Sequence, residues 1–354
     1  MSISYVRRGG VFLIIGILLP LLQGCATTDA TAAPVSDYAL VDRVTIGGVG
    51  GWDFVTFDSQ RQHLFISRSD RVQLWSAASK KVVAEIAGTA GVHGIALAQD
   101  LKRGFTSNGR ANTVSVFGLD DLRVTDTIAV PGTNPDAILY EPNFKRVYTF
   151  NGHSENMTVI DAVGLKVLAT IALGGKPEVA VSDGAGHVFV NIESTSELVV
   201  IDQATDRVQA RWPLAPCAEP TGLAIDVAHK RLFSVCANHK MAIIDADSGR
   251  LVADLPIGAG PDGVEFDAGL GEALSANGEG SLTLIHESDP EHFAVVATVQ
   301  TQPRARTLSL DPLSHRVYLV TALFGPLPPA TDQQPHPRAP MLPDTFTVLV
   351  LAPK

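Results

Sequence analysis

Charged side chains recur at regular intervals along this chain, each at the start of a short segment rich in apolar residues. Two such segments are Asp53-Phe-Val-Thr-Phe-Asp58 and Asp262-Gly-Val-Glu-Phe-Asp267. The residues that open the segments are Asp53, His93, Asp136, Glu178, Thr221, Asp262 and Arg306. If the fold brings these four carboxylates, one imidazole and one guanidinium together, they can bind a cation or a polar small molecule.

The spacing of these seven residues indicates a repeat architecture. Successive members are 40, 43, 42, 43, 41 and 44 residues apart. Three further β-rich segments follow each opening strand, separated by Gly, Asn and Asp turns, and four short strands make one propeller blade. The sequence therefore predicts an all-β protein, a single seven-bladed β-propeller over residues 39–354.

The two ends of the chain are expected to complete one blade together. The seventh repeat supplies only three strands, the last at 346–351, and the missing strand is found at 41–46. Ile46 lies seven residues before Asp53, which is the register of a fourth strand. We expect these two segments to pair and close the ring without an exposed edge. No helical period separates the strands, which excludes a parallel α/β sheet.

The first strand of each blade lines the central channel of a propeller, so the opening residues should meet at one channel mouth. The predicted ligand-binding residues are Asp53, His93, Asp136, Glu178, Asp262 and Arg306. A structural role stays open for this ring, and for His93 in particular, because polar groups at a channel mouth also serve as partners for water and backbone. No catalytic residue and no metal is assigned, since sequence gives no distance between carboxylates.

Loops between the second and third strands lie on the same face and contain Asn-Gly turns, as at Asn151-Gly-His153. Turn geometry accounts for the Asn and Gly residues, but it leaves four side chains unexplained. These are Arg110, His153, His239 and Glu279.

The first 38 residues are expected to direct and tether the protein. Arg7 and Arg8 precede an apolar run at 11–22, too short to span a membrane, which predicts a signal peptide at 1–24. Leu22-Gln-Gly-Cys25 resembles the bacterial lipobox, which implies cleavage before Cys25 and a lipid anchor on its thiol. Residues 25–38 are expected to be a flexible tether. The expected location is the cell envelope, on the outer membrane facing the periplasm or the cell surface.

Cys217 and Cys236 fall in the fifth repeat, with Cys236 expected opposite Thr221. In an oxidising envelope a disulfide between them is the favoured interpretation. A metal site formed with His239 is the alternative, although its ligand spacing is loose.

Residues 324–343 form a Pro-rich insertion in the seventh repeat, with seven prolines in 20 residues. Such a segment is stiff and extended. It is expected on the mouth face, where it either covers the channel, reaches an envelope protein partner, or serves only as a solvated spacer.

Composition excludes several classes of protein. Of 354 residues, 45% are hydrophobic, which excludes a disordered polymer, and 31 Gly with 22 Pro are too many for a helical bundle. A formal net charge of −10 argues against nucleic-acid binding. The chain is expected to be a monomer.

The repeat, with its Val-x-Val-Ile-Asp strand, turn, Lys-Val-Val and Thr-Ile, resembles the YVTN family of bacterial β-propellers, particularly its YncE-like members. Val92-His-Gly-Ile95 and Ala305-Arg-Thr-Leu308 are similar to stretches of that group, and the likeness extends over 41–351. It implies the propeller fold. The functions that it implies are diverse, from nucleic-acid binding to adhesion and redox partnership.

The favoured function is therefore a non-catalytic binding or scaffold lipoprotein for a small ligand or an envelope protein. One alternative is a metal-assisted lactone or ester hydrolase using the mouth residues, by analogy with other propellers. Another is a redox-partner propeller holding a quinone or haem-like cofactor, although no haem attachment motif is present. The sequence specifies no cofactor, and it contains no P-loop and no Gly-x-Ser-x-Gly elbow.

Overall fold

The computed structural model describes residues 4–5, 37–331, 335 and 337–354. The predicted signal peptide, the lipidation site Cys25 and nearly all of the predicted tether lie outside the described residues. Within the described residues, no helix is both long and apolar enough to cross a membrane.

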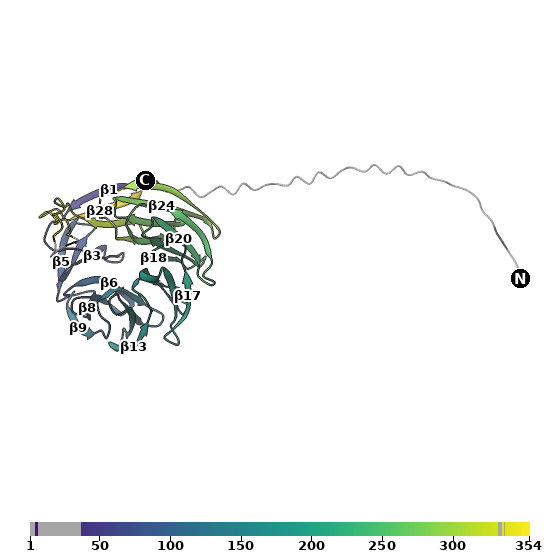
Figure 1. Ribbon diagram of the computed structural model, residues 1–354, viewed down its shortest axis with the longest axis horizontal. Helices are drawn as coiled ribbons and strands as arrows, with labels where there is room; N and C mark the ends of the chain where they lie inside the picture. Colours follow the sequence, from purple (N-terminus) through teal and green to yellow (C-terminus); the bar gives the residue numbers. More distant parts are fainter. Residues whose placement is uncertain (1–3, 6–36, 332–334, 336) are drawn as a thin grey trace. The chain divides into compact units, whose positions relative to one another are not determined.

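From Asp37 onward the chain forms seven four-stranded antiparallel sheets arranged as the blades of a propeller (Figure 1). This arrangement confirms the predicted fold. Blade one consists, from the channel outward, of β2 (Val55–Asp58), β3 (His63–Arg68), β4 (Arg71–Ser76) and β5 (Lys81–Ala87). Blade two consists in the same order of β6 (Val92–Ala98), β7 (Arg103–Asn108), β8 (Thr113–Gly118) and β9 (Val124–Ala129). Blade three consists of β10 (Pro135–Glu141), β11 (Arg146–Asn151), β12 (Asn156–Asp161) and β13 (Lys166–Ala172).

Blades four to six have the same order of strands. They are β14 (Pro177–Ser182), β15 (His187–Ile192), β16 (Glu197–Asp202), β17 (Arg207–Pro213); β18 (Pro220–Asp226), β19 (Arg231–Cys236), β20 (Lys240–Asp245), β21 (Leu251–Pro256); and β22 (Pro261–Asp267), β23 (Glu272–Asn277), β24 (Ser281–Asp289), β25 (His292–Gln300). Two single-turn 3₁₀ helices, η1 (Gln99–Leu101) and η2 (Glu193–Thr195), occupy turns.

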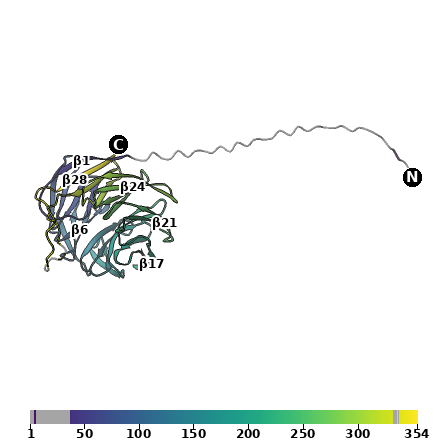
Figure 2. The same cartoon turned by 45° about the horizontal axis from the view of Figure 1, so that its top comes forward.

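Blade seven joins the two ends of the described chain. It consists of β26 (Leu308–Asp311), β27 (Arg316–Thr321), β28 (Thr347–Pro353) and, outermost, β1 (Tyr38–Thr45). β1 runs antiparallel to β28, with Tyr38 opposite Pro353 and Thr45 opposite Thr347, and the two strands lie side by side in both views (Figures 1 and 2). The expected ring closure is confirmed.

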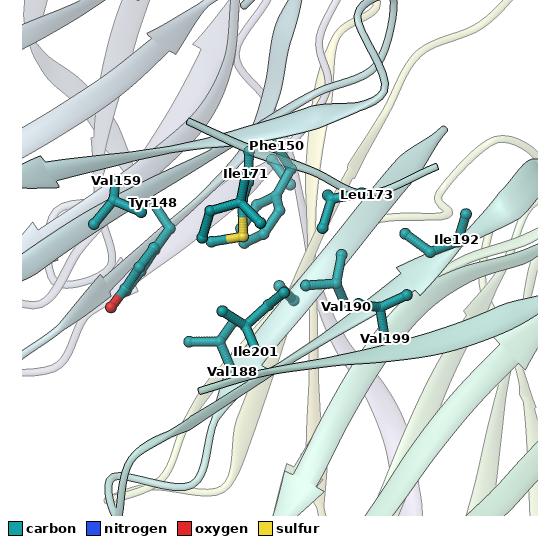
Figure 3. Close-up of a cluster of buried hydrophobic side chains, with 13 residues drawn as sticks. Tyr148, Phe150, Val159, Ile171, Leu173, Val188, Val190, Ile192, Val199 and Ile201 are labelled. Atoms are coloured by element: carbon teal, nitrogen blue, oxygen red, sulfur yellow. The ribbon is translucent and has the colours of Figure 1, made fainter. Parts of the chain in front are cut away.

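A buried apolar cluster fills each interface between neighbouring blades. Figure 3 shows the cluster between blades three and four, where Val188, Val190 and Ile192 of β15 face Phe150 and its neighbours. Alternate residues of one strand point to the same face, so the apolar alternation of the sequence places them together. Burying one such side chain stabilises the fold by about 1.5–3 kcal/mol.

The side chain of Tyr38 holds the closing strand in place. It is 2% exposed, packs in the cluster between blades six and seven, and donates a hydrogen bond from its hydroxyl to the His315 carbonyl oxygen at 2.7 Å. The outermost strand is therefore anchored across its own blade as well as by its ladder with β28.

The acidic residue that recurs at the far end of the inner strands has a structural role. Asp58 Oδ1 accepts hydrogen bonds from the backbone N–H groups of Gln60 and Arg61, which closes the turn into the next strand. Asp226 and Asp311 accept from the corresponding turns. In these three blades the end opposite the mouth therefore uses its carboxylates to form turns.

Candidate functional site

β-bulges position most of the mouth residues. In blades two to six the register of the inner strand shifts within its first four residues, where the sequence places His93, Asp136, Glu178, Thr221 and Asp262. A bulge turns a side chain away from the regular alternation of the strand, and bulges are common beside functional sites. The extra residue also corrects one expected pair, since Cys236 lies opposite Pro220 and not Thr221.

Asp53 and Arg306 precede their strands and do not open them as expected, because β2 begins at Val55 and β26 at Leu308. In blade one, a side chain replaces the missing ladder bond. The Ser67 hydroxyl accepts a hydrogen bond from the Asp53 N–H at 2.9 Å and donates one to the Phe54 carbonyl oxygen at 3.1 Å. Asp53 is thus fixed at the mouth without being part of a strand.

Three mouth residues from the first three blades form one cluster. His93 Nδ1 lies 2.7 Å from Asp53 Oδ2 and 3.6 Å from Asp136 Oδ1. One donor atom from each residue lies within 4.8 Å of the others, close enough to hold a metal ion. Two carboxylates and an imidazole are a donor set that suits a divalent transition metal.

Burial and neighbouring charges shift the pKa values in this cluster. Burial raises the pKa of Asp136 to about 6, against the opposing effect of His93. Burial disfavours the charged form of His93, but the hydrogen bond to Asp53 and the charge of Asp136 outweigh it and raise the pKa of His93. Burial thus favours the protonated form of Asp136, and the neighbouring carboxylates favour the protonated form of His93.

The other mouth carboxylates form ion pairs. Asp262 Oδ2 lies 3.1 Å from Arg306 Nε, and burial raises the pKa of Asp262 to about 6 against the effect of Arg306. Glu178 Oε1 lies 2.6 Å from Lys176 Nζ, and burial raises the pKa of Glu178 to about 8. Both carboxyls are thus held in a site that disfavours their charged forms.

Thr221 differs from the other mouth residues because its hydroxyl serves the backbone. It donates to the carbonyl oxygen of Pro261 in the next blade at 3.1 Å. This bond joins blades five and six, so Thr221 has a structural role.

A cavity of about 520 Å³ adjoins the Asp53–His93 pair at the mouth. Its wall includes Trp52, Asn134 and three arginines, Arg110, Arg306 and Arg338. Volumes of this size are typical of small-molecule sites. The lining of this cavity thus combines a carboxylate and an imidazole with three guanidinium groups.

A second cavity of about 590 Å³ shares Trp52, Arg306 and Arg338 with the first and adds Arg304 and Phe324. The ring of Trp52 lies 5.9 Å from that of Phe324, and the Arg304 guanidinium lies 3.8 Å from the Phe324 ring centroid. These contacts give the mouth a wall that is both aromatic and cationic.

The Pro-rich insertion lies at this mouth. Phe324 forms a β-bridge with Met341, which closes the insertion at its base, and Arg338 and Ala339 from within it line the second cavity. Of the loop residues that turn geometry leaves unexplained, Arg110 lines the first cavity. Glu279 instead accepts a hydrogen bond from the Ser281 hydroxyl at 2.8 Å.

Cys217 and Cys236 are joined in a disulfide, with Cα atoms 5.6 Å apart. Both residues are buried. The bonded sulfurs are not available as thiolate ligands, so this geometry does not support the alternative metal site with His239.

The repeat pattern did not single out some of the mouth residues, nor one buried carboxyl. Trp52 and Arg338 come from loops outside the repeat pattern, and Lys176 precedes its strand. Glu265 on β22 is a further case, since burial raises its pKa from 4.5 to about 7 and no other charge contributes. Its place in the repeat was the only available signal, because the other repeats have Thr56, Ser309 or an apolar residue there.

Comparisons with known proteins agree with the fold. A family model described as YNCE-like beta-propeller matches residues 26–186, which confirms the expected resemblance. The structure is similar to Kuenenia stuttgartiensis hydrazine synthase, with a TM-score of 0.66 and 18% identity, over 84% of this chain and 97% of that one. It is also similar to U3-55K, with a TM-score of 0.73 and 9% identity, over 88% and 99% of the two chains. At these identities the likeness shows the fold alone. No curated protein matches the sequence.

The substitution Glu265→Gln tests the environment of the channel. In the folded protein Glu265 keeps its proton up to about pH 7, whereas its ordinary pKa is 4.5, so the wild type loses stability as the pH rises between these values. Gln keeps the shape and cannot ionise. We expect the variant to match the wild type in urea unfolding at pH 4.5 and to exceed it at pH 8 by about 1–3 kcal/mol. The same difference at both pH values would contradict the account.

Proposed function

We propose that this YncE-like β-propeller is a binding protein that holds a small anionic molecule in the cavity at its channel mouth. The observation that carries the proposal is the convergence of Arg110, Arg306 and Arg338 on one cavity of about 520 Å³. Arg110 and Arg338 are exposed, and neither has an ion-pair or hydrogen-bond partner within the described part of the chain. A planar guanidinium binds carboxylate and phosphate groups through paired hydrogen bonds, so free arginines around a cavity favour an anion.

The carboxylate and imidazole in the lining of the cavity narrow the class of ligand further. Asp53 and His93 line the same cavity as the arginines, and a ligand that was anionic throughout would be repelled by the Asp53 carboxylate. A molecule with an anionic group at one end and hydroxyl or amino groups at the other matches both surfaces. Trp52 offers an apolar face for its carbon skeleton.

The Pro-rich insertion takes part in this proposal as a wall of the site. Arg338 and Ala339 come from it, and Phe324 at its base stacks with Arg304. Of the roles expected for the segment, covering the mouth has this support, whereas docking of a partner protein rests on its composition alone.

Anion binding is tested by titration calorimetry of the purified chain with citrate, glutamate, glycerol 3-phosphate and glucose 6-phosphate. We expect at least one of these probes to bind, and Arg110→Gln and Arg338→Gln each to weaken it about tenfold, since a charge-assisted hydrogen bond contributes about 1.5–3 kcal/mol. Arg123→Gln, an exposed arginine between β8 and β9, is the matched control and should not change the affinity. Equal affinities for all four proteins, or no binding of any probe, would refute the proposal.

A metal-assisted lactone or ester hydrolase is the second candidate, favoured by the cluster of Asp53, His93 and Asp136. A divalent metal held by these donors would supply an activated water to a bound ester. Metal analysis and assays with a lactone panel separate the candidates. If the protein is a hydrolase, the wild type binds a metal and hydrolyses a lactone, and His93→Ala loses both. If the wild type hydrolyses no lactone in the presence of added Zn²⁺, the hydrolase is excluded.

We further propose that the protein is an envelope lipoprotein anchored through Cys25, an assignment supported by its leader sequence. In bacterial cells fed labelled palmitate, the wild-type chain should carry the label and Cys25→Ser should not. Equal labelling of both proteins, or of neither, would exclude lipidation at this residue.

A further inference from the structure

A second cluster of ionisable side chains lies at the opposite end of the blades from the mouth. Asp226 ends β18 of blade five, His229 stands in the turn that follows, and Glu287 lies in β24 of blade six. The cluster therefore bridges two blades. The mouth site does not depend on this cluster, and the corresponding turns of the other blades form without it.

The three side chains converge closely. His229 Nδ1 lies 2.7 Å from Asp226 Oδ2 and 2.9 Å from Glu287 Oε1. The side chains of Asp226 and Glu287 are 5% and 2% exposed, whereas that of His229 is 49% exposed. The cluster is thus buried on the side of the two carboxylates and open to solvent at His229.

Glu287 lacks the partners that a buried carboxylate needs. His229 Nδ1 lies 2.9 Å from Oε1 without the geometry of a hydrogen bond, and Oε2 has no hydrogen-bond partner among the described residues, although the side chain is almost fully buried. The adjacent imidazole has one N–H at most at Nδ1, and Asp226 Oδ2 lies closer to it. A buried carboxylate without hydrogen bonds is strongly unfavourable, which indicates a missing partner.

The neighbouring Arg231 does not fill this role, because its donors are directed elsewhere. Its Nη1 bonds Asp245, its Nη2 bonds Glu291 and its Nε bonds the Pro290 carbonyl oxygen. None of these three Arg231 donors is directed at the two carboxylates, and a divalent cation bound between them would neutralise the negative charge that they carry.

We propose that Asp226, His229 and Glu287 bind a divalent transition-metal ion, with Zn²⁺ as the best match, which cross-links blades five and six. Imidazole with carboxylates favours zinc over calcium or magnesium, which prefer oxygen donors alone. Tetrahedral coordination at metal–ligand distances of about 2.0–2.2 Å places neighbouring donor atoms about 3.3–3.6 Å apart. The separations of 2.7 and 2.9 Å around His229 Nδ1 reach that geometry when each pair moves apart by less than about 1 Å. The open side of the cluster leaves room for water to complete the coordination.

The test uses the full chain carrying His93→Ala and Asp136→Asn, so that zinc at the mouth does not enter the count. We expect one equivalent of zinc per chain after dialysis, measured by elemental analysis, and a rise in the melting temperature on adding ZnCl₂, because binding to the folded state stabilises it. In the same background, Glu287→Gln should weaken zinc binding at least tenfold and abolish the rise. Gln keeps the shape of Glu and removes only the buried charge, so this variant is expected to fold.

Two further variants complete the test. His229→Ala changes a half-exposed side chain and should also lose the zinc. His187→Ala is the matched control, because His187 makes a similar contact of 2.7 Å with Asp183, but among the described residues no third donor joins that pair. It should keep the zinc. Equal zinc binding by all variants, or no zinc in the parent chain, would overturn the proposal.

Discussion

Pairing of β1 with β28 holds the ring closed, and the mouth exists only because the ring is closed. Asp53 in blade one and Arg306 in blade seven are far apart in sequence, yet the Thr307 hydroxyl donates to the Asp53 carbonyl oxygen at 2.8 Å. The Ser309 hydroxyl likewise accepts from the Phe57 N–H at 3.0 Å. These contacts join the first and last blades, and closing so long a loop costs conformational entropy that the strand pairing and the buried cluster between the blades must offset.

The closed ring brings together carboxyl groups at the mouth whose charged forms do not stabilise the fold. Burial raises the pKa of Asp136 and Asp262 to about 6 and of Glu178 to about 8, so ionising these carboxyls works against folding. Side chains that destabilise the folded state in this way are typical of binding and catalytic sites. A ligand that supplies hydrogen-bond donors to the carboxylates and an anionic group to the arginines would offset this cost.

The fold could be predicted from the sequence because each repeat forms one blade and because the number of strands shows how the ring closes. A missing fourth strand at one end and an extra strand at the other specify how blade seven is built, and the structure has that arrangement.

Details of the site depend on information that a repeat does not contain. The bulge that places Cys236 opposite Pro220 adds one residue to a strand without changing the spacing of the repeats. Arg338 reaches the mouth from an insertion, and Glu287 meets Asp226 only because neighbouring blades pack together.

The central claim is that the mouth cavity holds a small anionic molecule, and the most direct measurement is a crystal structure of the protein purified from the cells that make it. The account predicts electron density for a molecule whose anionic group contacts Arg110, Arg306 or Arg338 and whose other end faces Asp53 and His93. Density for water alone in this cavity, in a structure where a co-purified small molecule occupies another surface, would contradict it.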